Sequence, residues 1–200
     1  MELETVVGAY ARVAELYASL LGSVEQVHRD DLALVERHLG HLRGPVLDVG
    51  CGPGHWTEHL RSLGVDASGV DPVPPFVEHA RATHPLGRYD VGALPDPGPR
   101  DGSQAGVLAW YSLIHVEPAG LEPALAALRR LLRPGGTLVL GFFDGERVEP
   151  FEHRVVRAHR WPVDEVSRRL AAAGLVEVER ARRPAEEGHR PHAAVVARAA

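Results

Sequence analysis

The residues best suited to bind a ligand are acidic side chains that lie in or at the end of apolar runs, together with a glycine-rich turn. The run Val46–Val49 contains Asp48 and leads into glycines at positions 50, 52 and 54. Alternate glycines let the backbone adopt positive φ and approach a ligand closely, and residues 55–63 have the pattern of a helix whose amino terminus faces that ligand. A second apolar run, residues 65–70, ends at Asp71. Because a carboxylate at the end of the next parallel strand can accept both ribose hydroxyls, the sequence predicts a nucleoside-binding site.

The glycine spacing narrows the choice of ligand. A dinucleotide fingerprint, G-x-G-x-x-G, requires its third glycine where His55 stands, and no G-x-x-x-x-G-K-[ST] sequence occurs in the chain. Asp48–Gly54 matches D-x-G-x-G-x-G at every fixed position, so the chain resembles the class I S-adenosylmethionine-dependent methyltransferases in their first motif. Arg133–Leu138, with the preceding Leu132, is a further family-like feature. The alternative is a structural glycine-rich turn in another α/β protein.

The resemblance implies a set of residues for S-adenosylmethionine and its product S-adenosylhomocysteine. Asp71 would bind the ribose, although an Asp before a proline also ends strands in ordinary turns. Asp90, four residues before Leu94-Pro95, would face the adenine amino group, unless it is a solvated turn residue. Tyr17, in a predicted amino-terminal helix, would touch the cofactor, or would simply pack in the core. The cofactor set implied is Tyr17, Asp48, Gly50, Cys51, Gly52, Pro53, Gly54, His55, Trp56, Asp71, Pro72, Asp90, Val91, Trp110 and Tyr111.

The candidate catalytic residues lie in the stretch Trp110–His115, after the predicted fourth strand. Ligands of open α/β sheets bind at the carboxyl ends of the strands, and the faces of Trp110 and Tyr111 can attract a sulfonium cation. His115 is a candidate base for an acceptor hydroxyl because imidazole titrates near neutral pH, with Tyr111 as a second catalytic candidate. The alternative for His115 is a buried histidine that caps a helix or ties loops together.

The order of apolar patterns predicts an α/β fold. We expect two or three helices within residues 1–43, then strands over 46–49, 65–70, 88–91, 105–110, 137–143, 175–181 and 192–197, with helices over 55–63, 76–83, 121–132 and 161–173. The resemblance implies a Rossmann-like, seven-stranded, mostly parallel sheet with helices on both faces. Its last two strands would form an antiparallel hairpin joined by residues 184–191. The charged segment 144–160 would either cover the active site or form solvated surface.

Chain length and charge limit the classes of function. Two hundred residues suit one domain, here a methyltransferase domain over 1–200 with an amino-terminal helical lid, residues 1–43, and a core, residues 44–200. The net charge of −5 disfavours broad nucleic-acid binding. A single cysteine, no leader pattern and no apolar run of membrane-spanning length favour a cytoplasmic protein without membrane contact. Twelve histidines include no H-E-x-x-H sequence, and no metal site is predicted.

The function predicted is methyl transfer from S-adenosylmethionine to an unidentified acceptor by in-line displacement. The absence of an added recognition domain favours a small molecule as the acceptor, and the oligomeric state is left open. Two alternatives remain at this point: a non-catalytic protein of the same fold that binds S-adenosylmethionine or S-adenosylhomocysteine, and a different enzyme with a nucleoside cofactor, such as a reductase.

Overall fold

The computed structural model describes residues 3–185 and 190–200. Its helices are α1 (Leu3–Ala11), α2 (Ala14–Leu21), α3 (Arg29–Leu39), α4 (His55–Ser62), α5 (Pro74–Thr83), α6 (Leu121–Leu131) and α7 (Val163–Ala172), with short 3-10 turns at Val24–Gln26 and Pro118–Gly120. Its strands are β1 (Val46–Val49), β2 (Ala67–Asp71), β3 (Tyr89–Val91), β4 (Gln104–Trp110), β5 (Leu132–Asp144), β6 (Glu149–Phe151), β7 (Ala158–Trp161), β8 (Leu175–Arg183) and β9 (His192–Ala199).

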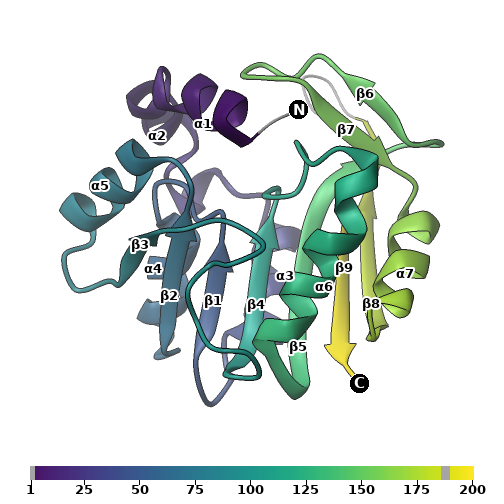
Figure 1. Ribbon diagram of the computed structural model, residues 1–200. Helices are drawn as coiled ribbons and strands as arrows, with labels where there is room; N and C mark the ends of the chain where they lie inside the picture. Colours follow the sequence, from purple (N-terminus) through teal and green to yellow (C-terminus); the bar gives the residue numbers. More distant parts are fainter. Residues whose placement is uncertain (1–2, 186–189) are drawn as a thin grey trace.

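The strands form one sheet in the order β3-β2-β1-β4-β5-β7-β6, and β9 pairs antiparallel with both β5 and β8 (Figure 1). Strands β1 to β5 are mutually parallel. The predicted fold class is therefore confirmed, including the closing antiparallel hairpin. The described residues hold nine strands rather than seven because segment 144–160 folds into the hairpin β6–β7, which extends the sheet beside β5. The predicted connection 184–191 lies partly outside the described residues.

Helices cover both faces of the sheet, as the resemblance implies. Leucines of α3 and α4, such as Leu34 and Leu60, are buried against one face. On the other face, α6 and α7 bury residues such as Leu125 and Leu170 (Figure 1). Burial of each such side chain stabilises the fold by about 1.5–3 kcal/mol. The two helix layers therefore hold the sheet, and with it the strand ends near the predicted site, in place.

Several element boundaries differ from the sequence prediction for local reasons. Helix α5 begins at Pro74 rather than residue 76, since proline is well tolerated in a first helical turn. The predicted helix start at Trp161 is wrong, because Trp161 ends β7 and Pro162 is the N-cap of α7. Strand β5 begins at Leu132 rather than at the predicted residue 137, and its register against β4 shifts between Gln104 and Gly106.

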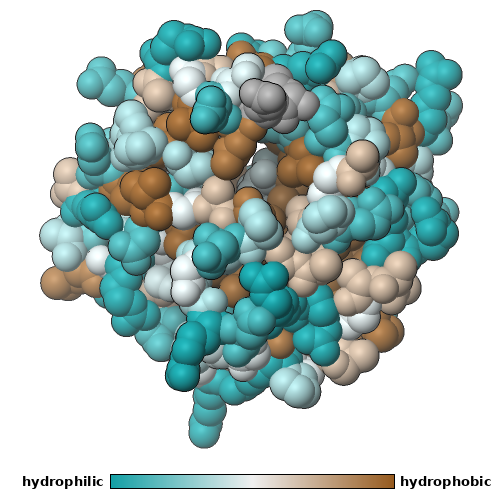
Figure 2. All heavy atoms as spheres, viewed as in Figure 1, coloured by the Kyte–Doolittle hydropathy of each residue, from teal (hydrophilic) through white to brown (hydrophobic). Residues whose placement is uncertain are grey.

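The carboxyl ends of the parallel strands meet at one edge of the sheet, below α1 and α2 in Figure 1. Tyr10 and Tyr17 from these helices pack on Phe76 of α5, with ring centroids 5.9 and 5.2 Å from that of Phe76. Figure 2 shows a hollow with hydrophobic residues around it on this part of the molecule. Among the described residues no helix is long and apolar enough to cross a membrane.

Candidate active site

The glycine loop joins β1 to α4, and its three glycines serve different purposes. All three have positive φ, between 52° and 89°. A methyl group on Gly50 would lie 2.4 Å from the Cβ of Ser112, and one on Gly54 would lie 2.9 Å from the ring of Tyr89. A methyl group on Gly52 would meet nothing within 4 Å. Packing therefore requires glycine at positions 50 and 54, whereas at Gly52 the space beside the backbone is free for a ligand.

The carboxylate of Asp71 is held against this loop. Its Oδ2 accepts a hydrogen bond from the Gly52 amide at 2.8 Å, and its Oδ1 accepts one from the Val73 amide at 2.8 Å. Burial raises the pKa of Asp71 to about 6, although these two amide bonds act in the opposite direction. Each carboxylate oxygen has a further lone pair, so the group can still accept hydrogen bonds from a pair of ribose hydroxyls.

Asp48 lies deeper than the loop it precedes. Its side chain is buried, and its Oδ2 accepts a hydrogen bond from the Thr57 hydroxyl at 2.7 Å. Burial raises the pKa of Asp48 to about 7, and the nearby Asp71 adds to this effect. This carboxyl therefore ties β1 to α4, and its Oδ2 faces helix α4.

The other loop residues of the predicted cofactor set have different surroundings. Cys51 and Pro53 are buried, with Cys51 in a small apolar cluster against α5. Trp56 packs in the core with its ring 5.5 Å from that of Trp110, and its Nε1 has no hydrogen-bond partner among the described residues. His55 begins α4, and burial lowers its pKa to about 4. His55 is thus neutral near pH 7.

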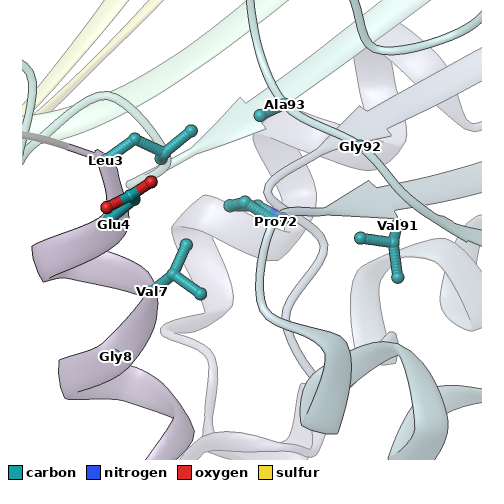
Figure 3. Close-up of a pocket in the computed structure, with 8 residues that line it drawn as sticks. All are labelled: Leu3, Glu4, Val7, Gly8, Pro72, Val91, Gly92 and Ala93. Carbon is teal, nitrogen blue, oxygen red and sulfur yellow. The ribbon is translucent and has the colours of Figure 1, made fainter.

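A pocket of about 470 Å³ lies between α1 and the strand ends. Figure 3 shows Leu3, Glu4, Val7 and Gly8 of α1 on one side, with Pro72, Val91, Gly92 and Ala93 on the other. Of the predicted cofactor set, Pro72 and Val91 line this pocket. Asp90 instead is exposed and pairs with Arg81 of α5 at 3.1 Å. Its proposed contact with adenine stays a prediction.

The side chain of His115 is engaged at both ring nitrogens. The Arg157 carbonyl, which can only accept, lies 2.8 Å from Nδ1, so Nδ1 carries the proton. Nε2 then accepts a hydrogen bond from the Tyr10 hydroxyl, also at 2.8 Å. Burial lowers the pKa of His115, which keeps the imidazole neutral. The lone pair on Nε2 accepts the hydrogen bond from the Tyr10 hydroxyl. The role of His115 as a base stays a prediction.

Trp110 and Tyr111 lie at the carboxyl end of β4, next to the loop from β1. The Tyr111 ring contacts that of Phe143 with centroids 4.8 Å apart, and the Tyr111 hydroxyl bonds to Nδ1 of His192. Phe143 in turn contacts Phe151 and His153 from segment 144–160. Segment 144–160 therefore contributes to this side of the site.

Sequence reasoning did not single out Tyr10 and His153, which contact His115, or His192 and Asp31, which lie beyond the Tyr111 hydroxyl. A usable signal existed for two of them. Asp31 shares one face of α3 with the buried Leu34 and Val35, an unusual place for a carboxylate. His192 begins an otherwise apolar strand. Their partners lie far away in the sequence, so no local pattern could pair them.

Residues 46–136 match the model of a methyltransferase domain family. A malonyl-[acyl-carrier protein] O-methyltransferase of Pseudescherichia vulneris is 32% identical over 137 residues, which is 66% of this chain and 51% of that protein. The chain thus spans about half the length of the curated relatives that it matches first.

Solved structures extend the likeness to the whole chain. A Burkholderia thailandensis 1,6-didemethyltoxoflavin-N1-methyltransferase, crystallised with its substrate and S-adenosylhomocysteine, superposes with a TM-score of 0.78 at 20% identity, covering 100% of this chain and 91% of that one. The cyclase SpnF gives 0.77 at 17% identity, covering 97% and 95%. At these identities the likeness shows the fold, which also carries other activities.

The motif, the sheet and these relatives agree. Residues 46–136 are similar to a methyltransferase domain, and the whole chain has the Rossmann-like fold that the resemblance to class I S-adenosylmethionine-dependent methyltransferases implies.

Proposed function

We propose that this protein transfers a methyl group from S-adenosylmethionine to a small-molecule acceptor. The observation that carries the proposal is the pairing of an open cradle at Gly52 with the carboxylate of Asp71, which the same Gly52 amide holds in place. A nucleoside with a ribose diol needs both features at this separation along two adjacent parallel strands. When bound, the cofactor supplies an electrophilic methyl group on a sulfonium.

The residues around the cradle have distinct proposed tasks. Asp71 binds the ribose, and Pro72 and Val91 bound the pocket that takes the adenine side. Trp110 and Tyr111 face the sulfonium end, where aromatic rings favour a cation. Tyr17 closes the site from α2, with its ring 5.6 Å from that of Tyr10.

We further propose that residues 1–43 act as a lid within one domain, residues 1–200, and that Tyr10 and His115 fasten it. Their hydrogen bond joins α1 to the loop after β4 across 105 residues of sequence. Such a closure excludes water and holds the acceptor in line with the methyl group. Positioning of this kind can lower a barrier by about 7 kcal/mol or more, so methyl transfer needs little acid–base machinery.

A small-molecule acceptor is favoured over nucleic acid by the net charge of −5 and by a solved neighbour that methylates 1,6-didemethyltoxoflavin. The single cysteine, which is buried and free, fits a reducing compartment, and we propose a cytoplasmic protein.

The direct test is an acceptor screen with radiolabelled S-adenosylmethionine and a panel of small hydroxyl, amine and carbon nucleophiles. We expect labelled product and S-adenosylhomocysteine in equal amounts. Asp71→Ala should lose the activity, whereas Asp66→Ala, one residue before the start of the same strand, should keep it. Binding of the cofactor without transfer to any acceptor would favour a non-catalytic binding protein, and binding of NADH instead would favour a reductase.

A further inference from the structure

Tyr111 has an unusual backbone for its type. Among the described residues it is the one non-glycine residue with positive φ, at 56°. A side chain disfavours this conformation, which persists where the surroundings enforce it and is concentrated at functional sites. Here the Tyr111 amide donates to the Gly141 carbonyl at 2.9 Å, and the ring packs between Phe143 and His192, with centroids 4.8 and 5.4 Å away. The fold therefore holds Tyr111 in one strained position at the carboxyl end of β4.

The hydrogen-bond partner of the Tyr111 hydroxyl is the imidazole of His192. His192 is the first residue of β9, where it pairs with Phe143 on one side and Arg183 on the other, so the closing hairpin delivers it to the edge that carries the site. Its side chain is 2% exposed, and Nδ1 bonds to the Tyr111 hydroxyl. Nε2 lacks an aligned hydrogen-bond partner among the described residues, but it lies 3.3 Å from Oδ1 of Asp31. A modest turn of the imidazole would complete that bond.

Asp31 provides an ionised carboxylate behind His192. It is 5% exposed in the first turn of α3 and accepts two hydrogen bonds from Arg183, at 2.5 and 2.8 Å. Burial alone would raise the pKa of Asp31, but the nearby His192 imidazole and the Arg183 guanidinium outweigh burial, and the pKa is lowered. A carboxylate facing Nε2 places the imidazole proton on Nε2, which leaves Nδ1 to accept the proton of the Tyr111 hydroxyl.

We propose that Tyr111, His192 and Asp31 form a proton relay that serves methyl transfer. The inference rests on the proposed function. As the acceptor oxygen or nitrogen bonds to the methyl carbon, the S–C electron pair stays on sulfur and the acceptor proton passes to the Tyr111 oxygen. The hydroxyl proton of Tyr111 passes to Nδ1 of His192, and the resulting imidazolium is stabilised by Asp31.

The site holds a second tyrosine–histidine pair, Tyr10 and His115, and comparison of the two pairs favours His192 as the proton acceptor. His115 also accepts from a tyrosine hydroxyl, but its other nitrogen donates to the neutral carbonyl of Arg157. A neutral carbonyl stabilises an imidazolium less than an ionised carboxylate does. At His192 the guanidinium of Arg183, from β8, opposes the imidazolium, whereas the carboxylate of Asp31, from α3, supports it. Of the two imidazoles, His192 is the better proton acceptor.

The first test measures the protonation of His192 in the free protein and needs no acceptor. In ¹⁵N-histidine NMR of the free protein, with His192→Gln used for assignment, His192 should be the neutral Nε2–H tautomer at pH 8. In Asp31→Ala the preference for this tautomer should weaken, because the carboxylate that faces Nε2 is gone. A neutral Nδ1–H tautomer in wild type, or an unchanged tautomer preference in Asp31→Ala, would overturn the proposal.

The second test uses the acceptor that the screen identifies. Since general base catalysis contributes about 10²–10⁴-fold, Tyr111→Phe and His192→Gln should each lower kcat by about 10²-fold with KM changed less than threefold. The double variant should be no slower than the slower single variant, because the two residues act as one unit. Additive losses, or a loss confined to KM, would refute the relay.

A matched control is His159→Gln. His159 is 3% exposed, and its Nε2 lies 3.5 Å from the Glu117 carboxylate, so the change disturbs a similar buried imidazole. It should leave kcat within threefold of wild type, and an equal loss would show that burial, rather than the relay, explains the effect. A wild-type protein that binds no S-adenosylmethionine would defeat the proposed function, while the NMR test would still decide the relay.

Discussion

Two glycines allow the proposed cradle to be tested apart from backbone strain. Gly52 lies in the loop between β1 and α4, and Gly64 follows α4 at the other end of that helix. Their φ values are +52° and +86°, and a methyl group on either would meet nothing within 4 Å. Gly52→Ala and Gly64→Ala therefore impose the same kind of strain and differ in whether the new methyl group enters the cradle.

The expected loss of stability is the same for both variants. Placing an alanine in the left-handed region costs about 1–2 kcal/mol. For a chain of this size, 1 kcal/mol lowers Tm by about 2–4 °C, so each variant should melt about 2–8 °C below wild type. Circular dichroism melts of the two variants side by side would measure this.

Cofactor affinity should separate the two variants. At Gly52 the methyl group occupies space that the proposed cofactor needs, and we expect affinity for S-adenosylhomocysteine to fall at least tenfold, which is about 1.4 kcal/mol. Gly64→Ala should bind as wild type does. Calorimetric titration measures both, and equal affinity of the two variants would refute the assignment of Gly52 as the cradle.

Three further variants test the packing around the site. Because burial raises the pKa of Asp48 to about 7, far above its value in the unfolded chain, its stabilising protonated form is lost as pH rises. Urea unfolding should thus show wild type losing about 2–3 kcal/mol relative to Asp48→Asn between pH 5 and 8; a pH-independent difference would contradict this. Gly54→Ala forces a methyl group to 2.9 Å from the Tyr89 ring, so denaturant unfolding should show a loss of about 2–5 kcal/mol, and a smaller loss than in the two variants above would contradict it. Tyr10→Phe leaves Nε2 of His115 buried without its partner, at a cost of about 1–3 kcal/mol. Amide exchange in α1 should then accelerate, and unchanged exchange would show that this bond does not fasten the helix.

The glycine loop and Asp71 could be predicted because their signals are local. An apolar run, an alternation of glycines and a second apolar run ending in Asp fall within 26 residues, from 46 to 71, and parallel pairing of the two runs brings Asp71 onto Gly52. The helices themselves followed from their apolar periodicity, which the buried leucines of α3 and α6 confirm, whereas their placement on both faces followed from the family resemblance.

The remaining parts of the site depend on contacts without a local signal. Asp31 and Arg183 are 152 residues apart, and Tyr111 and His192 are 81 apart. The strand β6 has three residues and lies in a charged segment, so its pairing is set by β7 and not by its own pattern. Asp90 shows the reverse case: its position relative to Leu94-Pro95 predicted a binding role, while its side chain pairs with Arg81.

The central claim is that the site at Gly52 and Asp71 binds the nucleoside cofactor of methyl transfer. The most direct measurement is calorimetric titration of wild type, Asp71→Ala and Asp66→Ala with S-adenosylmethionine and S-adenosylhomocysteine, with a melting curve for each variant. We predict micromolar 1:1 binding of both ligands to wild type and to Asp66→Ala, with binding lost in a folded Asp71→Ala. A folded wild-type protein that binds neither ligand, or a folded Asp71→Ala that binds as wild type does, would contradict the account.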